Sequence, residues 1–338
     1  MGFNGRFLLN LIHYATTRGL QLESLVALTT LSHDHLNEED TRITTEVYDR
    51  VLQEIIVQTQ DELFGLRAGE YLNLSAAGLV GQITQTSATV QEALQYCCEF
   101  ANLGCSMLPM ALTEEADNFK LTITPHPLWL QHSPDIVRHT VDGVIAFTIR
   151  QFSALTRQQH TPLCIDYGFQ ASQEVHFYEK AFQAPVYFNK PITAIFLDKK
   201  QVTAPIITSN YDLLRTLVSF ANTKSKQMAT EEGFHNAVRR TLIHMMPTAL
   251  PSLAQVAASF NVSTRTFQRK LKEEGYTFQS LVDALRQEFA KSYLQDTTLQ
   301  MADIAYLLGY AEASVFARAF KRWTNQTPQE YRFGVLNI

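Results

Sequence analysis

Two segments near the C-terminus carry side chains whose types and spacing suit nucleic-acid recognition. Residues 264–274 and 313–324 each place apolar side chains at helical spacing and charged or amide side chains on the remaining face. Arg and Gln can form paired hydrogen bonds with guanine and adenine edges, and Lys and Arg contact phosphates. The residues expected to face outward are Arg265, Gln268, Arg269 and Lys272 in the first segment and Ser314, Arg318, Lys321 and Arg322 in the second.

Each of these segments follows a shorter helical segment across a tight turn. Ser252 can cap the first short helix, Asn261 lies at the break, and Ser263 can cap the helix that follows. Residues 300–326 repeat this arrangement, with Gly309 in the place of Asn261. A helix, a tight turn and a second capped helix form a helix-turn-helix motif, so the sequence predicts two of them.

The two predicted motifs are joined by residues 278–295, which predict a single helix. At 1.5 Å per residue this helix is about 27 Å long. A connection of this length can hold two recognition helices roughly one DNA turn apart, ~34 Å, on one face of the duplex.

The charge of the chain is unevenly distributed. Residues 233–338 contain 12 Lys and Arg against 8 Asp and Glu, whereas residues 1–232 contain 16 against 25, and the whole chain carries a net charge of −5. A basic C-terminal part joined to an acidic remainder is typical of a polyanion-binding domain attached to a domain with another task.

The 338 residues, 46% of them hydrophobic, are enough for two domains with separate cores. Before about residue 200, helical periodicity comes first, and alternating strand patterns follow; the helix expected over 89–103 opens with a T-V-Q-E capping box. The other helices expected there cover 7–19, 22–28, 44–59, 136–155 and 175–182. We therefore expect an α+β sensing or dimerisation domain over 1–200, a helical linker over 201–232, and an all-α domain with two helix-turn-helix motifs over 233–338.

The chain has no apolar run of the ~18 residues that a membrane span needs, and its start lacks a signal-peptide cleavage site. A soluble cytosolic protein without membrane association is expected. The four cysteines fit that compartment as core or half-buried thiols on one helix, with a redox sensor as the alternative. They are Cys97, Cys98, Cys105 and Cys164.

Other groupings of reactive side chains give weaker predictions. The run Ser32-His33-Asp34-His35 lacks a partner metal motif, so loop residues are expected rather than a metal site. His126, His132 and His139 could line a ligand site or lie on the surface, and the stretch with Met107 and Met110 could edge an apolar pocket or pack in the core. Because no nucleotide-binding or hydrolase motif occurs, we expect no catalytic residue, no cofactor and no bound metal.

The C-terminal third resembles the AraC/XylS family of transcription regulators. Residues 304–332, IAYLLGYAEASVFARAFKRWTNQTPQEYR, are similar to the family signature almost position for position, including Gly309, Phe316 and Phe320. Upstream, GLQLESLVAL, DELFGLRAGEYL and GLVGQITQTSATVQEALQY are similar to the start of the arabinose-binding type N-terminal domain, and HFYEKAFQAPVYFNKPITAIFLDKKQV to its end. The family label does not make arabinose the ligand.

This resemblance implies DNA contacts in both recognition helices. The matching base-contact or adjacent phosphate positions are Arg265, Gln268, Arg269, Ala313, Ser314 and Arg318. Ala313 departs from members that carry a long polar side chain there, since alanine can only touch a thymine methyl. We therefore expect the second motif to contribute more positioning than base readout, and Trp323 to pack in the core.

The resemblance also implies double-stranded DNA as the partner, a homodimer, a small-molecule effector, a cytoplasmic location and contact with RNA polymerase when the protein acts as an activator. Three functions stay open: a ligand-responsive regulator, a regulator whose N-terminal domain only dimerises or binds a protein, and an enzyme with an appended DNA module. Residues 209–232 are the expected element that couples the ligand to DNA affinity.

Overall fold

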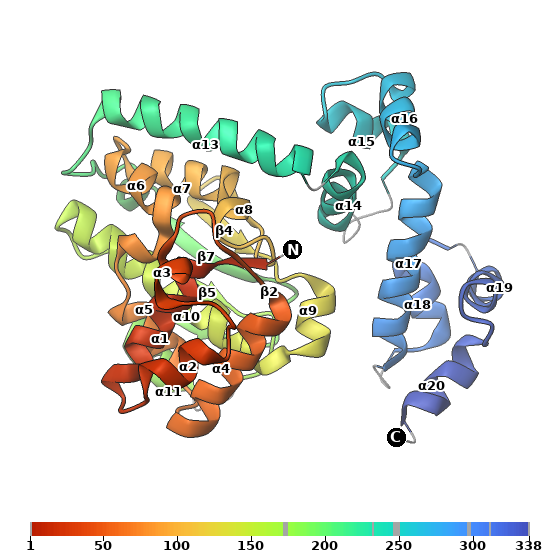
Figure 1. Cartoon of the computed structure of the whole chain (residues 1–338), viewed down its shortest axis with the longest axis horizontal. Coiled ribbons are helices and arrows are strands. Elements are labelled where there is room, and N and C mark those ends of the chain that lie inside the picture. The colour runs from red at the N-terminus through yellow and green to blue at the C-terminus, as the bar shows by residue number, and fades with distance from the viewer. Residues whose placement is uncertain are drawn as a thin grey trace. The chain divides into compact units, whose positions relative to one another are not determined.

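The computed structural model describes residues 2–171, 175–231, 233–245, 251–295, 299–310 and 312–336. Contacts divide the chain into two compact units, residues 1–225 and residues 226–338, and the division falls within helix α13 (Tyr211–Glu231) (Figure 1). The first unit combines helices with a five-stranded sheet and the second is helical, which confirms the predicted fold classes. The domain limits at 200, 232 and 233 stay predictions.

The larger sheet of the first unit has the strand order β3-β4-β7-β5-β6. Neighbouring strands are antiparallel, except that β5 and β6 are parallel. Strands β3 and β4 form a hairpin, with Met110 opposite Ile123. The strands of this sheet are β3 (Met110–Glu114), β4 (Asn118–Ile123), β5 (Cys164–Asp166), β6 (Val186–Tyr187) and β7 (Thr193–Asp198), and a second sheet pairs β1 (Gly2–Asn4) with β2 (Arg42–Thr44).

The helices predicted in the first unit lie close to their expected ranges, except at residues 89–103, but α3, α5, η1, α6, α9 and α12 were not predicted. The helices of the first unit are α1 (Gly5–Thr17), α2 (Leu22–Ala27), α3 (His33–Asn37), α4 (Thr45–Thr59), α5 (Phe64–Tyr71), η1 (Leu74–Ala77), α6 (Gly78–Thr86), α7 (Val90–Glu99), α8 (Ala101–Gly104), α9 (Pro127–His132), α10 (Pro134–Thr156), α11 (Val175–Phe182) and α12 (Lys199–Val202).

Residues 89–103 were expected to form one helix opened by a capping box, and both details are wrong. Thr89 Oγ1 accepts a hydrogen bond from Glu92 N at 3.2 Å, but Glu92 Oε2 accepts from Ala88 N rather than from Thr89 N. The helix then ends at Glu99, and the short α8 follows. Only half of the capping box forms because the Glu92 carboxylate reaches one residue further back.

The long helix α10 packs closely against α5 because glycines face it. A Cβ atom at Gly65 would lie 1.9 Å from His139 O, and one at Gly69 would lie 2.2 Å from Gly143 O. The missing side chains therefore set the distance between the two helices, and α10 is held in the centre of the first unit.

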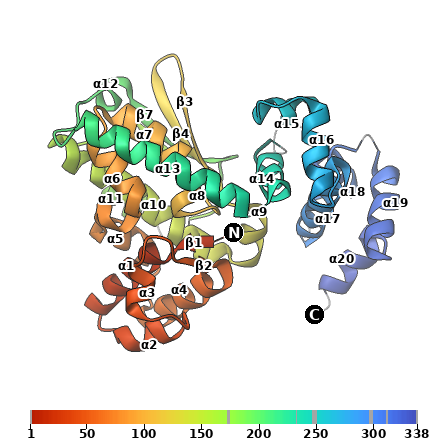
Figure 2. The ribbon, with the colours of Figure 1, turned by 45° about the horizontal axis from the view of Figure 1, so that its top comes forward.

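Helix α13 runs beside α6, α7 and α8 of the first unit (Figures 1 and 2). Its Leu214, Ala221 and Lys224 are buried, whereas most of its other described side chains are exposed or half-buried. The predicted linker is helical over α13 but not over residues 204–210, where Pro205 forms an isolated bridge with Thr89. Proline disfavours helix at the residue before it and lacks an N–H, which explains the interruption.

The second unit contains seven helices within its described residues. They are α14 (Phe234–Met245), α15 (Leu253–Ser259), α16 (Thr264–Glu273), α17 (Phe278–Gln295), α18 (Met301–Leu307), α19 (Ala313–Thr324) and α20 (Pro328–Leu336). One apolar core contains buried side chains from both predicted motifs and from the helix α17 between them. Both predicted helix-turn-helix motifs and their connecting helix are confirmed as structural elements.

Candidate nucleic-acid interface and apolar cavity

Helix α16 is oriented by its cap and by two buried side chains. Ser263 Oγ accepts a hydrogen bond from Thr266 N at 3.2 Å, and Asn261 has the left-handed φ of 53° expected at the turn. Phe267 and Leu271 are fully buried in the core of the second unit. The opposite face is therefore exposed, and it carries the predicted contact residues Arg265, Gln268, Arg269 and Lys272.

Helix α19 repeats this arrangement with different chemistry. Phe316 and Phe320 are fully buried, and Gly309 has a left-handed φ of 74°. Ala313 is half-buried against the core, as is Trp323, which packs there as expected. The predicted contact residues exposed on this helix are Ser314, Arg318, Lys321 and Arg322.

The two helices differ in how freely their cations can pair with phosphates. Arg269 Nη1 pairs with Glu273 Oε1 at 2.5 Å, one helical turn away. Among the described residues, no ion pair engages Arg265, Arg318 or Arg322. Arg269 must therefore release Glu273 before it contacts DNA, whereas the others need no such step.

The sequence showed no sign of the side chains that hold the two helix-turn-helix motifs against α17 and α14. Arg286 of α17 donates from Nε to Leu308 O at 3.0 Å, and its guanidinium lies 4.4 Å from the ring centre of Tyr310. Glu274 accepts hydrogen bonds from Phe234 N and His235 N, the first amides of α14. These contacts join residues 22 to 40 positions apart, so no local pattern in the sequence could reveal them.

The first unit contains an apolar cavity of about 150 Å³. Its wall comes from α1, η1, α6, α7, α8, the β3–β4 hairpin and α10. Met110 lines it, as one reading of the sequence suggested, while Met107 packs in the core. Among the described residues, none that lines the cavity carries a charged side chain.

The four cysteines are free thiols that are neither fully buried nor exposed, as predicted. The prediction that they share one helix is wrong, because only Cys97 and Cys98 lie on α7, while Cys105 follows α8 and Cys164 begins β5. Cys97 and Cys105 line the cavity. Burial raises the pKa of the Cys97 thiol and raises that of Cys105 to about 12. Both thiols are therefore neutral at physiological pH, which does not favour the redox-sensor alternative.

His132 is exposed, as one of its two predicted alternatives has it, but the other candidate histidines lie elsewhere than expected. His33 and His35 begin the short helix α3 rather than a loop, and the described residues contain no group of three ligands placed to hold a metal. His126 and His139 are buried rather than on the surface, and none of the three candidate histidines lines the 150 Å³ cavity. His139 Nδ1 accepts a hydrogen bond from Gly65 N at 3.2 Å, and burial lowers its pKa to about 3.

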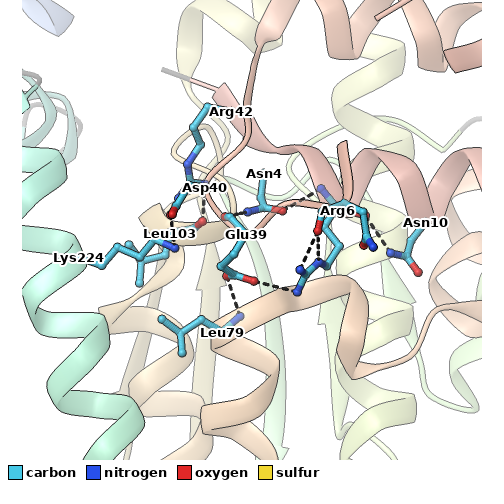
Figure 3. Close-up of polar contacts among 10 residues, drawn as sticks. Asn4, Arg6, Asn10, Glu39, Asp40, Arg42, Leu79, Leu103 and Lys224 are labelled. Atoms are coloured by element: carbon cyan, nitrogen blue, oxygen red, sulfur yellow. Dashed lines mark hydrogen bonds and ion pairs between the residues drawn. The ribbon is translucent and has the colours of Figure 1, made fainter. Parts of the chain in front are cut away.

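The loop of residues 39–42 connects the cavity wall to α13 (Figure 3). Glu39 pairs through Oε2 with Arg6 Nη1 at 2.8 Å and accepts a hydrogen bond through Oε1 from Leu79 N at 3.1 Å. Arg42 donates to Leu103 O, and Asp40 forms an ion pair with Lys224 of α13. We call residues 39–42 the hub loop.

The elements held by the hub loop also enclose the cavity. The partners of the loop in these elements are each next to a lining residue along the chain. Arg6 lies between the lining residues Asn4 and Phe7. Leu79 precedes the lining residue Val80, and Leu103 precedes the lining residue Gly104. The lining residues named here belong to β1, α1, α6 and α8. A change in their spacing therefore reaches the loop that contacts α13.

None of the described helices is both long enough and apolar enough to cross a membrane. The model described as the arabinose-binding domain of AraC transcription regulator matches residues 19–206, and a helix-turn-helix domain model matches residues 256–333. With two helix-turn-helix motifs on one core, the fold is that of a DNA-binding transcription regulator. Because the first match spans more than half of the chain, the chain belongs to the AraC family.

The chain is similar to two regulators of Pseudomonas aeruginosa. It is 24% identical over 269 residues to the ornithine utilization regulator, covering 79% of this chain and 78% of the relative. It is 24% identical over 276 residues to the HTH-type transcriptional regulator VqsM, covering 79% and 83%. Among solved structures, the transcriptional regulator CdpR of the same species is 25% identical with a TM-score of 0.44, covering 84% of this chain and 90% of that chain.

Proposed function

We propose that the chain is a ligand-responsive transcription regulator in which a small molecule in the cavity of the first unit changes the affinity of the second unit for DNA. A ligand can do this only if it binds the active and inactive arrangements with different affinity. The hub loop supplies a physical connection, since it joins the cavity wall to α13, and α13 continues along the chain into the second unit. This connection is the observation that carries the proposal.

In the second unit, we assign base readout mainly to α16 and positioning mainly to α19. The exposed face of α16 presents Gln268 together with Arg265 and Arg269, whose side chains suit adenine and guanine edges. The exposed face of α19 presents Ser314 and three cations, which suit phosphates, and its Ala313 can offer a base only a methyl group. The partner is double-stranded DNA read in two successive major-groove segments.

The first test is a footprint of the full-length protein on the DNA flanking its own gene, at two salt concentrations. We expect a protected direct repeat whose affinity falls steeply as salt rises, because phosphate contacts release counterions. Protection that is independent of salt would contradict the assignment of the exposed cations to phosphates.

The second test fills the cavity in the full-length chain. Gly104 lines the cavity, and a Cβ atom there would meet no atom within 4 Å, so Gly104→Leu can be accommodated. We expect a reporter gene behind the footprinted promoter to be expressed at one constant level with this variant, under all growth conditions. Val57→Leu, at an exposed position of α4, is the control and keeps wild-type regulation.

The alternative is a regulator whose first unit only dimerises or binds a protein. Leu213 and Phe220 on α13 favour it, since they are 46% and 54% exposed. In that case Gly104→Leu behaves as the wild type, whereas Phe220→Ser changes regulation. The homodimer, the RNA polymerase contact and the cytoplasmic location stay predictions.

A further inference from the structure

We propose that the cavity takes an uncharged, mainly apolar molecule about the size of one aromatic ring, with at most one strong hydrogen-bond donor. The inference names the ligand class of the effector site, so its regulatory meaning rests on the proposed function. Its binding chemistry rests only on the cavity.

The volume sets the size of the molecule. At about 150 Å³ the cavity is as large as an engineered protein cavity that stays dry and binds benzene. Its wall includes Phe7, Leu94, Leu108, Val144 and Phe152, which offer dispersion contacts over the whole of a small ring. The cavity is partly open to solvent, so the remainder of a larger molecule would lie outside this wall.

The lack of charge in the wall sets the polarity of the molecule. No described lining residue is charged, and the Cys97 and Cys105 thiols are held neutral by burial. A carboxylate or an ammonium would therefore be desolvated without a partner of opposite charge, which strongly disfavours its binding.

The hydroxyl groups of the wall are already engaged as donors. Each lining threonine donates to a backbone carbonyl one helical turn earlier, at 2.7–2.8 Å. The pairs are Thr84 with Val80 O, Thr140 with Ile136 O and Thr148 with Val144 O. Two of their oxygens have a second partner, since Thr84 Oγ1 lies 3.2 Å from Cys97 Sγ and Thr140 Oγ1 lies 3.0 Å from the Tyr48 hydroxyl. A hydroxyl oxygen has two lone pairs, so the threonines offer a ligand acceptors rather than donors, and Thr148 has no second partner among the described residues.

The amide side chains of the wall, Asn4 and Gln151, also form hydrogen bonds within the protein. Asn4 donates from Nδ2 to Glu39 O at 2.8 Å, and its Oδ1 accepts from Arg6 N at 2.9 Å. Gln151 donates from Nε2 to Leu72 O at 2.9 Å, and its Oε1 accepts no hydrogen bond from any described residue. Gln151 Oε1 is therefore the strongest acceptor left for a ligand hydroxyl or N–H.

These features select against a sugar. Arabinose would bring several hydroxyl groups into a wall that offers weak thiol donors and few free acceptors. Each buried hydroxyl without a partner lowers affinity about 5- to 100-fold. A phenol, by contrast, buries an apolar ring and donates a single hydrogen bond.

The experiment measures binding to the full-length protein by isothermal titration calorimetry, with phenol, toluene, benzoate and L-arabinose as probes at pH 7. We expect phenol to bind in a saturable one-site manner and toluene up to about 10-fold more weakly, since it lacks the donor. Benzoate has the same ring with a charge, and we expect it to bind at least about 100-fold more weakly than phenol. L-arabinose should give no saturable heat.

A cavity-filling variant locates the binding. Gly104→Leu should abolish the phenol heat, and Val57→Leu should leave it unchanged. If Gly104→Leu does not fold, Ala101→Leu, at another small residue of the cavity wall, should likewise abolish the phenol heat. Benzoate or L-arabinose binding as tightly as phenol would overturn the proposal, and so would the absence of saturable binding by phenol and toluene.

A parallel titration of operator DNA separates this proposal from the proposed function. Phenol that binds in the cavity without changing operator affinity would support the ligand class and contradict ligand responsiveness to that class. Operator affinity that responds to L-arabinose, with no phenol binding, would overturn the ligand class and leave ligand responsiveness intact.

Discussion

Lys224 of helix α13 forms an ion pair with Asp40 of the hub loop. The Lys224 side chain is 11% exposed, whereas that of Asp40 is 83% exposed. Because one partner is in solvent, the pair contributes only about 0.2–1 kcal/mol to stability. The pair lies between the cavity wall and the helix that continues into the second unit, so the proposed coupling would pass through it.

Replacing Lys224 by Met should uncouple the two units. Met keeps the apolar stem that packs on the first unit but removes the charge that holds Asp40. We expect Lys224→Met to reduce the effect of a bound cavity ligand on operator affinity to less than half, measured by fluorescence anisotropy. Lys199→Met breaks the Lys199–Glu114 ion pair away from α13 and should keep the full response; equal losses in both variants would contradict the role of the hub loop.

The arginines of the two recognition helices should respond differently to specific and random DNA. Arg269→Ala on α16, which we assign to base readout, should weaken operator binding by ~1–3 kcal/mol and change binding to random DNA little. Arg318→Ala on α19, which we assign to positioning, should weaken both about equally, and a competition titration measures both. Equal losses on both DNAs for Arg269→Ala would identify a phosphate contact instead, and Arg50→Ala on the first unit should change neither.

The buried carboxyl group of Asp142 should make stability depend on pH. Burial raises its pKa from 3.8 to about 7, although Arg138 Nη1 lies 3.9 Å from Oδ2 and opposes the shift. The folded chain therefore keeps a proton that the unfolded chain has released. The contribution of Asp142 to stability is greatest below pH 3.8, falls as pH rises to about 7, and is level above that.

Asp142→Asn should remove this dependence and leave the free energy of unfolding higher than that of the wild type at pH 8. Urea unfolding in a Trp323→Phe background, where Trp129 alone reports on the first unit, measures it. His139, with a pKa lowered to about 3, acts in the opposite direction below pH 6.5, so the difference between variant and wild type isolates Asp142. Parallel pH profiles would show that Asp142 is ionised in the folded chain.

The packing of α5 on α10 should not tolerate a methyl group at Gly65. A Cβ atom there would lie 1.9 Å from His139 O, so Gly65→Ala must push the helices apart and should cost about 1–3 kcal/mol. The same fluorescence assay measures the loss. Gly104→Ala, whose Cβ atom meets nothing within 4 Å, should change stability by less than about 0.5 kcal/mol.

Local signals in the sequence predicted the DNA-binding unit well. Ser263 and Asn261 act within a few residues of their own positions, and the spacing of Phe267 and Leu271 assigns the faces of α16 directly. The sequence indicated one edge of the cavity, at Met110, but neither the rest of its wall nor the hub loop. Glu39 contacts Arg6 and Leu79, 33 and 40 residues away, and only the folded chain brings these partners together.

The histidines show the same limit. His139 lies on a helix whose periodicity was recognised, but its burial depends on Gly65, 74 residues earlier in the chain. The interruption of the predicted linker helix before α13 is predictable from the sequence, because Pro205 lies there. The capping box at Thr89 failed for a local reason, because a Glu side chain can reach either of two neighbouring amides.

The shared core of the second unit constrains the spacing of the DNA half-sites that the protein can bind. Phe267, Phe289 and Phe320 pack in one cluster, so the two recognition helices share one hydrophobic core. Inserting one base pair between the two half-sites turns one of them by about 34–36° around the DNA axis, given 10–10.5 base pairs per turn. The promoters that this regulator controls should therefore differ in the base sequence of each half-site but keep a constant number of base pairs between the two half-sites.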